Sequence, residues 1–228
     1  MHDTATELEE RGFAIRDGVF SSEEMLQIAD RLERSNLKRS KAGIRHLLNN
    51  GAIADLAVDT RLLNLAQRIL GPEAIPFHAT LFDKSAEVNW LVVWHQDTAL
   101  PLREKCETHG WGPWSVKAGV IYAHAPASAL CQVLTLRIHL DDSKLENGPL
   151  RVLPKTHQKG VMSDDNIAHL AAQIAPISCV VRQGGVLAMR PLIVHASSKS
   201  RSEIPRRVIH IEYAASRTFS PGLELTIA

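Results

Sequence analysis

The chain has 228 residues, 45% of them hydrophobic, and its 26 basic side chains nearly balance 25 acidic ones, giving a net charge of +1. This composition predicts a globular protein long enough to bury a core, and the balanced charge argues against a nucleic-acid-binding surface. The three cysteines (Cys106, Cys131 and Cys179) are widely spaced, so we expect free thiols in a reducing compartment. The acidic, polar start and the lack of a long apolar run favour a cytoplasmic protein without a signal peptide or membrane span.

The first third of the chain has the periodicity of helices. The run 12–15 predicts a short strand before a turn. The segment 21–24 (Ser-Ser-Glu-Glu) is typical of a helix N-terminus, and apolar residues follow it at helical spacing. A second helix is expected over 54–70, because the Gly-Pro pair at 71–72 would end it there.

From residue 74 onward, short β-rich segments alternate with turn residues, and only 166–173 has helical character. The expected strands cover 75–81, 90–94, 118–123, 132–140, 150–153, 177–181, 186–189 and 207–213. Their spacing predicts an antiparallel sandwich or barrel. We therefore expect one domain over 1–228, with a helical part at 1–73 packed on one sheet, a β core at 74–214 and a tail at 215–228.

A His-x-Asp pair follows the apolar run 88–94. Side chains alternate along an extended backbone, so His95 and Asp97 point to the same face. A distant histidine, His195, closes a second apolar run at 185–194. Two imidazoles and one carboxylate are the ligand set of non-haem iron(II) oxygenases. A His-x-Asp pair alone is common, but its place at the end of a buried strand favours a metal site.

Four segments of the chain resemble the phytanoyl-CoA dioxygenase family of iron(II)- and 2-oxoglutarate-dependent oxygenases. They are Leu81-Phe82-Asp83-Lys84 with Trp94-His95-Gln96-Asp97, Leu136–Ser143 with Glu146–His157, Gly184-Gly185-Val186, and His195-Ala196-Ser197-Ser198 with Arg206-Arg207. The resemblance implies a double-stranded β-helix, or jelly roll, that holds one iron ion near its open end. It also implies a reaction in which 2-oxoglutarate and dioxygen oxidise a small organic substrate, with release of succinate and carbon dioxide.

The same resemblance assigns roles to particular residues. It implies His95, Asp97 and His195 as the metal ligands. Halogenating members of the family have a small residue in place of the carboxylate, so Asp97 favours hydroxylation over halogenation.

The far carboxylate of 2-oxoglutarate requires a cationic partner, and the planar fork of arginine can bind it through two hydrogen bonds. Arg206 lies 11 positions after His195, a spacing that matches the family, and is the expected partner. Its neighbour Arg207 would face the opposite side of an extended segment. Ser197 resembles the serine that hydrogen-bonds the cosubstrate, and Lys84 either assists with a carboxylate or is solvated.

Residues 98–117 form the main irregular stretch of the β region, and we expect them to border the substrate. Within this stretch, Trp111 and Trp114 either stack on the substrate or anchor the loop. Arg137 falls inside an expected strand, where a buried guanidinium must have a partner. It therefore faces solvent, an acidic neighbour or a carboxylate such as that of the cosubstrate.

Two other functions remain open from the sequence. The first is a cupin-like metal enzyme that needs no 2-oxoglutarate and would not depend on Arg206. The second is a non-catalytic binding barrel, which has no need for all three metal ligands. In each case we expect a small-molecule ligand, no nucleic acid or membrane partner, and a monomer or homodimer.

Overall fold

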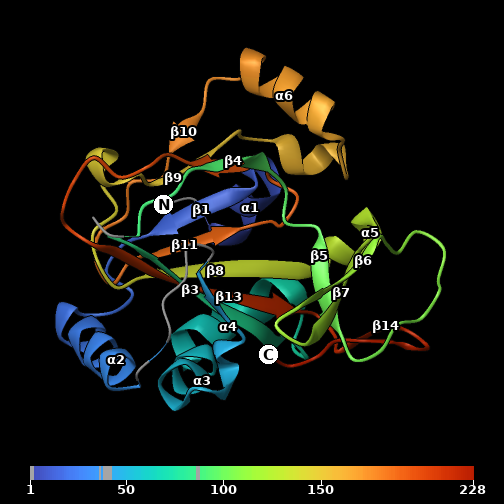
Figure 1. Ribbon diagram of the computed structural model, residues 1–228, viewed down its shortest axis with the longest axis horizontal. Coiled ribbons are helices and arrows are strands. Elements are labelled where there is room, and N and C mark those ends of the chain that lie inside the picture. Colours follow the sequence, from blue (N-terminus) through green and yellow to red (C-terminus); the bar gives the residue numbers. More distant parts are fainter. Residues whose placement is uncertain (1–2, 36, 38–42, 86–87) are drawn as a thin grey trace.

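The computed structural model describes residues 3–35, 37, 43–85 and 88–228, and two antiparallel sheets dominate it. The larger sheet has the order β1-β11-β8-β13-β3-β2, and the smaller has the order β10-β9-β12-β4 (Figure 1). The larger sheet contains β1 (Phe13–Arg16), β2 (Ile44–Arg45), β3 (Ile75–Lys84), β8 (Val133–His139), β11 (Val186–Met189) and β13 (Arg206–Ala214). The smaller contains β4 (Val92–His95), β9 (Leu150–Val152), β10 (Ile177–Ser178) and β12 (His195–Ser197). Together they form the double-stranded β-helix expected from the sequence.

Helices from the first third of the chain cover one face of the larger sheet, as expected. Figure 1 shows α2 (Ser22–Arg34), α3 (Gly51–Ala57) and α4 (Thr60–Leu70) beneath β3, β8 and β13. On β13, Ile209, Ile211 and Tyr213 join the core on this side, whereas His210 and Glu212 line a cavity on the other. Strand alternation therefore separates an apolar, helix-covered face from a polar inner face.

Two helices replace the single helix expected over 54–70. The first helix, α3, ends at Ala57 with Val58 as its C-cap. The Asp59 carboxylate then caps α4 by accepting a hydrogen bond of 2.9 Å from the Arg61 backbone amide. Aspartate is a favoured N-cap because it satisfies an amide that has no partner within the helix. The start of α2 is confirmed, since Ser21 and Glu24 form a reciprocal capping box. A further helix, α1 (Thr4–Arg11), precedes β1.

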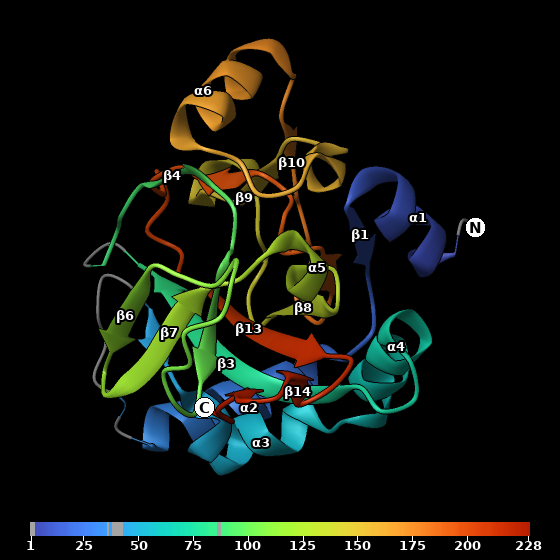
Figure 2. The same cartoon turned by 90° about the vertical axis from the view of Figure 1, so that its right-hand side faces the viewer.

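The stretch 98–117 is only partly irregular, which corrects the expectation from the sequence. Its ends form β5 (Ala99–Leu102) and β6 (Trp114–Lys117), which pair with β7 (Val120–His124) in the order β5-β7-β6. This small sheet lies at the right-hand end of the jelly roll in Figure 1 and faces the viewer in Figure 2. Pro101 argues against a central strand, but β5 is an edge strand, where the missing amide donor is tolerated.

The tail at 215–228 is packed against the rest of the protein. It forms a hairpin of β14 (Thr218–Ser220) and β15 (Leu223–Glu224), and Leu223 and Leu225 are fully buried. The Ala228 amide donates a hydrogen bond of 2.8 Å to the Phe77 carbonyl on β3. The remaining elements are α5 (Ala127–Leu130), α6 (Asp164–Gln173), which confirms the expected helix, and the 3-10 turns η1 (Leu47–Asn49), η2 (Leu145–Asn147) and η3 (Thr156–Lys159). No helix among the described residues is long and apolar enough to cross a bilayer.

Candidate metal centre

Strand pairing brings the two histidines of the predicted triad together. His95 at the end of β4 is the register partner of His195 at the start of β12, so both side chains project to the same side of the smaller sheet. Their ring centroids lie 4.2 Å apart. Asp97 follows two residues after His95, and its backbone amide donates to the Pro191 carbonyl at 3.0 Å. One ligand atom from each of His95, Asp97 and His195 lies within 4.8 Å of the others.

Hydrogen bonds orient both imidazoles toward the same point. The Nδ1 atom of His95 contacts the Val93 carbonyl at 2.8 Å, and Nδ1 of His195 contacts the Ile193 carbonyl at 2.9 Å. A carbonyl only accepts, so each Nδ1 carries the proton and each Nε2 keeps a free lone pair. The Nε2 atoms lie 3.6 and 3.5 Å from the two carboxylate oxygens of Asp97.

The donor set fits a divalent metal ion. Oδ2 of Asp97 is buried and has no hydrogen-bond partner among the described residues, although a buried carboxylate oxygen normally has one. Two imidazoles and one carboxylate on one side of an ion leave about three positions free, which suits iron(II). The Asp97 and His95 side chains are 31% and 36% exposed, against 4% for His195, so the open side of the centre faces the cavity.

The charge states of two of these groups also suit metal binding. Burial lowers the pKa of His195 to about 4, which leaves its imidazole neutral at pH 7. Burial alone would raise the pKa of Asp97, but the imidazoles of His195 and His95 outweigh it and hold that pKa well below its usual range. A neutral imidazole and an ionised carboxylate are the forms that bind metals.

Gln96 holds the segment between the two candidate ligands in place. Its side-chain amide donates to the carbonyls of Gly160 and Leu192 at 2.9 and 2.7 Å, and its oxygen accepts from the Met162 amide at 2.9 Å. All hydrogen-bonding groups of a largely buried amide are therefore used to join β4 to the chain before α6 and before β12. Gln96 is a positioning residue for the centre.

The centre opens into a cavity of about 600 Å³ between the two sheets. Arg206, Lys84 and Ser197, the three residues predicted to bind the cosubstrate, all line it. Lys84 Nζ donates to Ser197 Oγ at 2.7 Å and to the Ser198 carbonyl at 2.6 Å. Arg206 is 3% exposed, and its Nε has no partner among the described residues. Lys84 is 1% exposed, which excludes the solvated alternative.

Burial and repulsion by neighbouring cations disfavour the charged forms of Lys84 and Arg206. Burial, followed by the charges of Arg206 and Arg137, lowers the pKa of Lys84 to about 7. Burial, followed by the charge of Arg137, lowers the pKa of Arg206 to about 9. Buried like charges are typical of places where a ligand of opposite charge binds, so their closeness favours the predicted anion-binding role.

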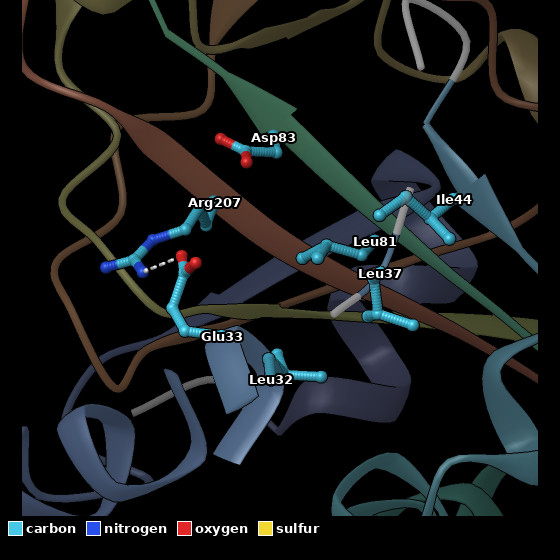
Figure 3. A pocket seen from close by; sticks show the side chains of 7 residues that line it. All are labelled: Leu32, Glu33, Leu37, Ile44, Leu81, Asp83 and Arg207. Atoms are coloured by element: carbon cyan, nitrogen blue, oxygen red, sulfur yellow. Dashed lines mark ion pairs between the residues drawn. The ribbon is translucent and has the colours of Figure 1, made fainter. Parts of the chain in front are cut away.

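Arg207 lies on the opposite face of the larger sheet, as predicted. Its guanidinium donates twice to Asp141, with both distances 2.9 Å, and lies 3.6 Å from Glu33 of α2. Figure 3 shows Arg207 and Glu33 on the helix side, in a small separate pocket beside Leu81. Of the adjacent pair, only Arg206 therefore points inward.

The three candidate substrate residues differ in whether they line the cavity. Arg137 lines the cavity, but Trp111 and Trp114 do not. Both tryptophans pack against the apolar cluster below the small sheet, and the Trp111 ring lies 5.7 Å from that of Phe219. This packing favours the loop-anchoring alternative over substrate stacking.

A chain of polar side chains that reaches the same cavity was not anticipated from the sequence. The His46 ring Nε2 lies 2.8 Å from the Tyr122 hydroxyl, which lies 3.2 Å from His78 Nε2. His78 Nδ1 contacts the Glu212 carboxylate at 2.6 Å. The four residues come from four distant segments, and nothing in their spacing along the chain signals that they meet.

Comparison with known proteins places this geometry in a family. The family model for phytanoyl-CoA dioxygenase (PhyH) matches residues 8–208. The chain belongs to the phytanoyl-CoA dioxygenase family. A mouse protein named phytanoyl-CoA dioxygenase domain-containing protein 1 is 31% identical over 41% of this chain, and the match spans only 38% of that protein.

Solved structures share the fold of this phytanoyl-CoA dioxygenase family member at low sequence identity. EctD from S. alaskensis, solved with 2-oxoglutarate and 5-hydroxyectoine, has a TM-score of 0.71 at 17% identity and covers 92% of this chain and 74% of its own. SnoN, described as a non-haem alpha-ketoglutarate-dependent epimerase of nogalamycin biosynthesis, has a TM-score of 0.70 at 17% identity, with coverage of 94% and 80%. At this identity the likeness establishes the jelly roll.

Proposed function

We propose that the protein is a non-haem Fe(II)- and 2-oxoglutarate-dependent oxygenase that hydroxylates a small organic molecule. The convergence of His95, Asp97 and His195 at the open side of a cavity carries this proposal. An iron centre of this type, with 2-oxoglutarate and dioxygen, couples cosubstrate decarboxylation to substrate oxidation and yields succinate and carbon dioxide.

The residues around the centre support a diacid cosubstrate. Arg206 is assigned to the far carboxylate, because it is the inward-facing member of the arginine pair and has an unused donor at Nε. Lys84 lies directly opposite Arg206 in the pairing of β3 with β13, and its ammonium reaches Ser197, two residues from His195. A diacid that spans from Arg206 to the metal would pass beside the Lys84 ammonium and the Ser197 hydroxyl. The inner location also excludes water from these contacts, which strengthens them.

Asp97 supports hydroxylation as the outcome. Its carboxylate occupies the ligand position that halogenating members of the family leave to a halide. The EctD structure was solved with a hydroxylated compound, whereas SnoN is described as an epimerase, so the fold itself accommodates more than one outcome. We assign hydroxylation on the ligand set of this chain.

The test is succinate formation from 2-oxoglutarate by purified protein with Fe(II) and ascorbate under air. We expect slow succinate formation by the wild type, and a loss of at least 100-fold with His95→Ala or Asp97→Ala, since a ligand is removed from the metal. His124→Ala is the matched control, because His124 lines the same cavity outside the triad and its imidazole hydrogen-bonds only to Thr98 among the described residues. Full activity in either ligand variant, or no 2-oxoglutarate consumption by the metal-loaded wild type, would refute the proposal.

A further inference from the structure

Arg137 is a buried cation to which the proposed function gives no role. It is 5% exposed and lines the cavity. Its Nη1 donates to His210 Nδ1 at 2.8 Å, and its guanidinium carbon lies 5.1 Å from the centre of the Phe82 ring. Its Nε has no hydrogen-bond partner, and no carboxylate among the described residues forms an ion pair with it. A buried guanidinium normally has such a partner.

The sheet around Arg137 cannot supply the missing charge. Its register partners are Leu187 on β11 and His210 on β13. Burial, followed by the charge of Arg137, lowers the pKa of His210 well below its usual value, so His210 is a neutral acceptor. Burial lowers the pKa of Arg137 itself to about 10, which leaves it charged at neutral pH. The charge of Asp97 acts on Arg137 from a distance, but no carboxylate among the described residues contacts the guanidinium, which leaves room for an anionic group of a molecule in the cavity.

The net charge of the cavity lining also favours an anionic ligand. Five basic side chains line it (Arg45, Lys84, Lys117, Arg137 and Arg206), against two acids, Asp97 and Glu212. Asp97 belongs to the metal centre, and Glu212 contacts His78 at 2.6 Å. A 2-oxoglutarate dianion would offset Arg206 and Lys84. An excess of positive charge remains, and a cavity with low-dielectric walls concentrates anions in proportion to such an excess.

Arg137 also lies at a different level of the sheet from the cosubstrate cations. Arg206 pairs with Lys84 across β13 and β3, whereas Arg137 pairs with His210, four residues further along β13. At about 3.4 Å per residue, the two backbone positions are about 14 Å apart. His210 is close enough to the metal centre for the charge of Asp97 to act on its pKa. The charge of Asp97 also acts on Arg137, and the charge of Arg137 acts on Lys84 and Arg206. The Arg137 guanidinium therefore lies between the metal centre and the cosubstrate cations, where it can reach a molecule bound beside the metal.

We propose that Arg137 binds an anionic group of the substrate, and that the substrate is a small organic acid, most simply a carboxylate. The inference rests on the function proposed above. Arg137 offers the carboxylate two adjacent donors on a rigid plane, held in orientation by His210 and the Phe82 ring. The cavity volume of about 600 Å³ is within the range of small-molecule sites.

The test compares carboxylic acids with their own primary amides, which have nearly the same shape but no charge. A panel of aliphatic and aromatic monocarboxylates of three to ten carbons, with the matching amides, is titrated into protein that holds Mn(II) and 2-oxoglutarate, and binding is followed by thermal stability. The same panel is then added to the Fe(II) protein, and stimulation of succinate formation is measured. Wild type, Arg137→Met, Arg206→Met and Arg151→Met are compared, each after a circular-dichroism check of folding. Arg151 is the control, because its guanidinium also lies over a ring, that of Trp94 at 5.1 Å, but does not line the cavity.

We expect at least one carboxylate to bind the wild type and Arg151→Met about 10- to 100-fold more tightly than its amide, the range for hydrogen bonds to a charged group. Arg137→Met is expected to lose this preference and to keep its 2-oxoglutarate dissociation constant within threefold of the wild-type value, whereas Arg206→Met loses cosubstrate affinity. The inference is overturned if no carboxylate is preferred over its amide, or if Arg137→Met weakens 2-oxoglutarate binding as strongly as Arg206→Met. Absence of 2-oxoglutarate binding and succinate formation in the wild type instead overturns the proposed function, so the two failures are distinguishable.

Discussion

Replacement of Lys84 by methionine tests whether the inner face of the larger sheet holds a cation at the expense of stability. Lys84 is 1% exposed and lies among Arg206, Arg137 and the ring of Trp90, which is 5.3 Å from its ammonium. Burial and the two guanidinium charges lower its pKa from 10.5 to about 7. Methionine keeps most of the volume of the side chain without the charge. We therefore expect Lys84→Met to be more stable than the wild type at low pH in the absence of ligands.

The sign and size follow from proton linkage. Between pH 7 and pH 10.5 the unfolded chain carries the proton on Lys84 and the folded protein does not, so wild-type stability rises with pH over this window. Below pH 7 the full penalty applies, which is about 5 kcal/mol at 1.36 kcal/mol per pKa unit, and at pH 9 about 2 kcal/mol remains. The variant loses the hydrogen bonds to Ser197 and the Ser198 carbonyl, at about 1 kcal/mol each. The net expectation is a stabilisation of about 3 kcal/mol at pH 6 that falls to near zero at pH 9.

The assay is urea unfolding of metal-free protein followed by tryptophan fluorescence at pH 6, 7, 8 and 9. Only the difference between variant and wild type is used, so histidines that titrate in both proteins cancel. Lys159→Met is the matched control, because this lysine is exposed and far from the arginines in sequence, and its difference from the wild type should not change with pH. A Lys84→Met difference that is constant between pH 6 and pH 9, or a wild type that is more stable at pH 6, would show that Lys84 is not a desolvated cation.

Three further outcomes are expected. Arg206→Gln weakens 2-oxoglutarate binding by about 10- to 100-fold in calorimetric titrations. Arg207→Gln leaves this binding unchanged but lowers the unfolding free energy by about 1–2 kcal/mol, because it disrupts the pairing with Asp141. Equal losses of binding in the two variants would contradict the assignment of Arg206 to the cosubstrate. Gly184→Ala lowers the unfolding free energy by about 2–4 kcal/mol, because a Cβ there would clash with the Phe20 carbonyl oxygen. Gly119 has a similar φ with open space around it, so Gly119→Ala is the control. A loss for Gly184→Ala no larger than that for Gly119→Ala would argue against this clash. Tyr213→Phe costs about 1–2 kcal/mol in denaturant unfolding, because the Ala57 carbonyl loses its buried donor; a neutral result would mean that water replaces the hydroxyl.

The metal centre could be predicted from the sequence because its geometry is largely local. His95 and Asp97 are two residues apart, and the alternation of an extended chain places them on one face. The same alternation separates Arg206 from Arg207. His195 is distant in sequence, and its meeting with His95 depends on the register of β4 and β12, which the family resemblance supplied and the residue pattern did not.

Other features depend on tertiary structure and left no readable signal. β12 has three residues, too few for a periodicity. β5 contains Pro101, which is tolerated only because the strand lies at an edge. The polar chain from His46 to Glu212 joins the residue before η1 to β3, β7 and β13 through contacts between side chains. The break at Asp59 had a signal, since aspartate is a favoured N-cap, but the apolar spacing on either side obscured it.

The pattern of β13 explains why the inner face was difficult to interpret. From Ile209 to Tyr213, apolar and polar residues alternate, which is typical of a strand with one face in water. Yet Arg206, His210 and Glu212 are all under 9% exposed, because the smaller sheet closes over them. Burial of so many ionisable groups opposes folding, and an apolar face would be more stable. Their presence is consistent with selection for ligand binding at the expense of stability. The Lys84→Met variant measures the stability side of this trade-off, and the Arg137→Met variant measures the binding side.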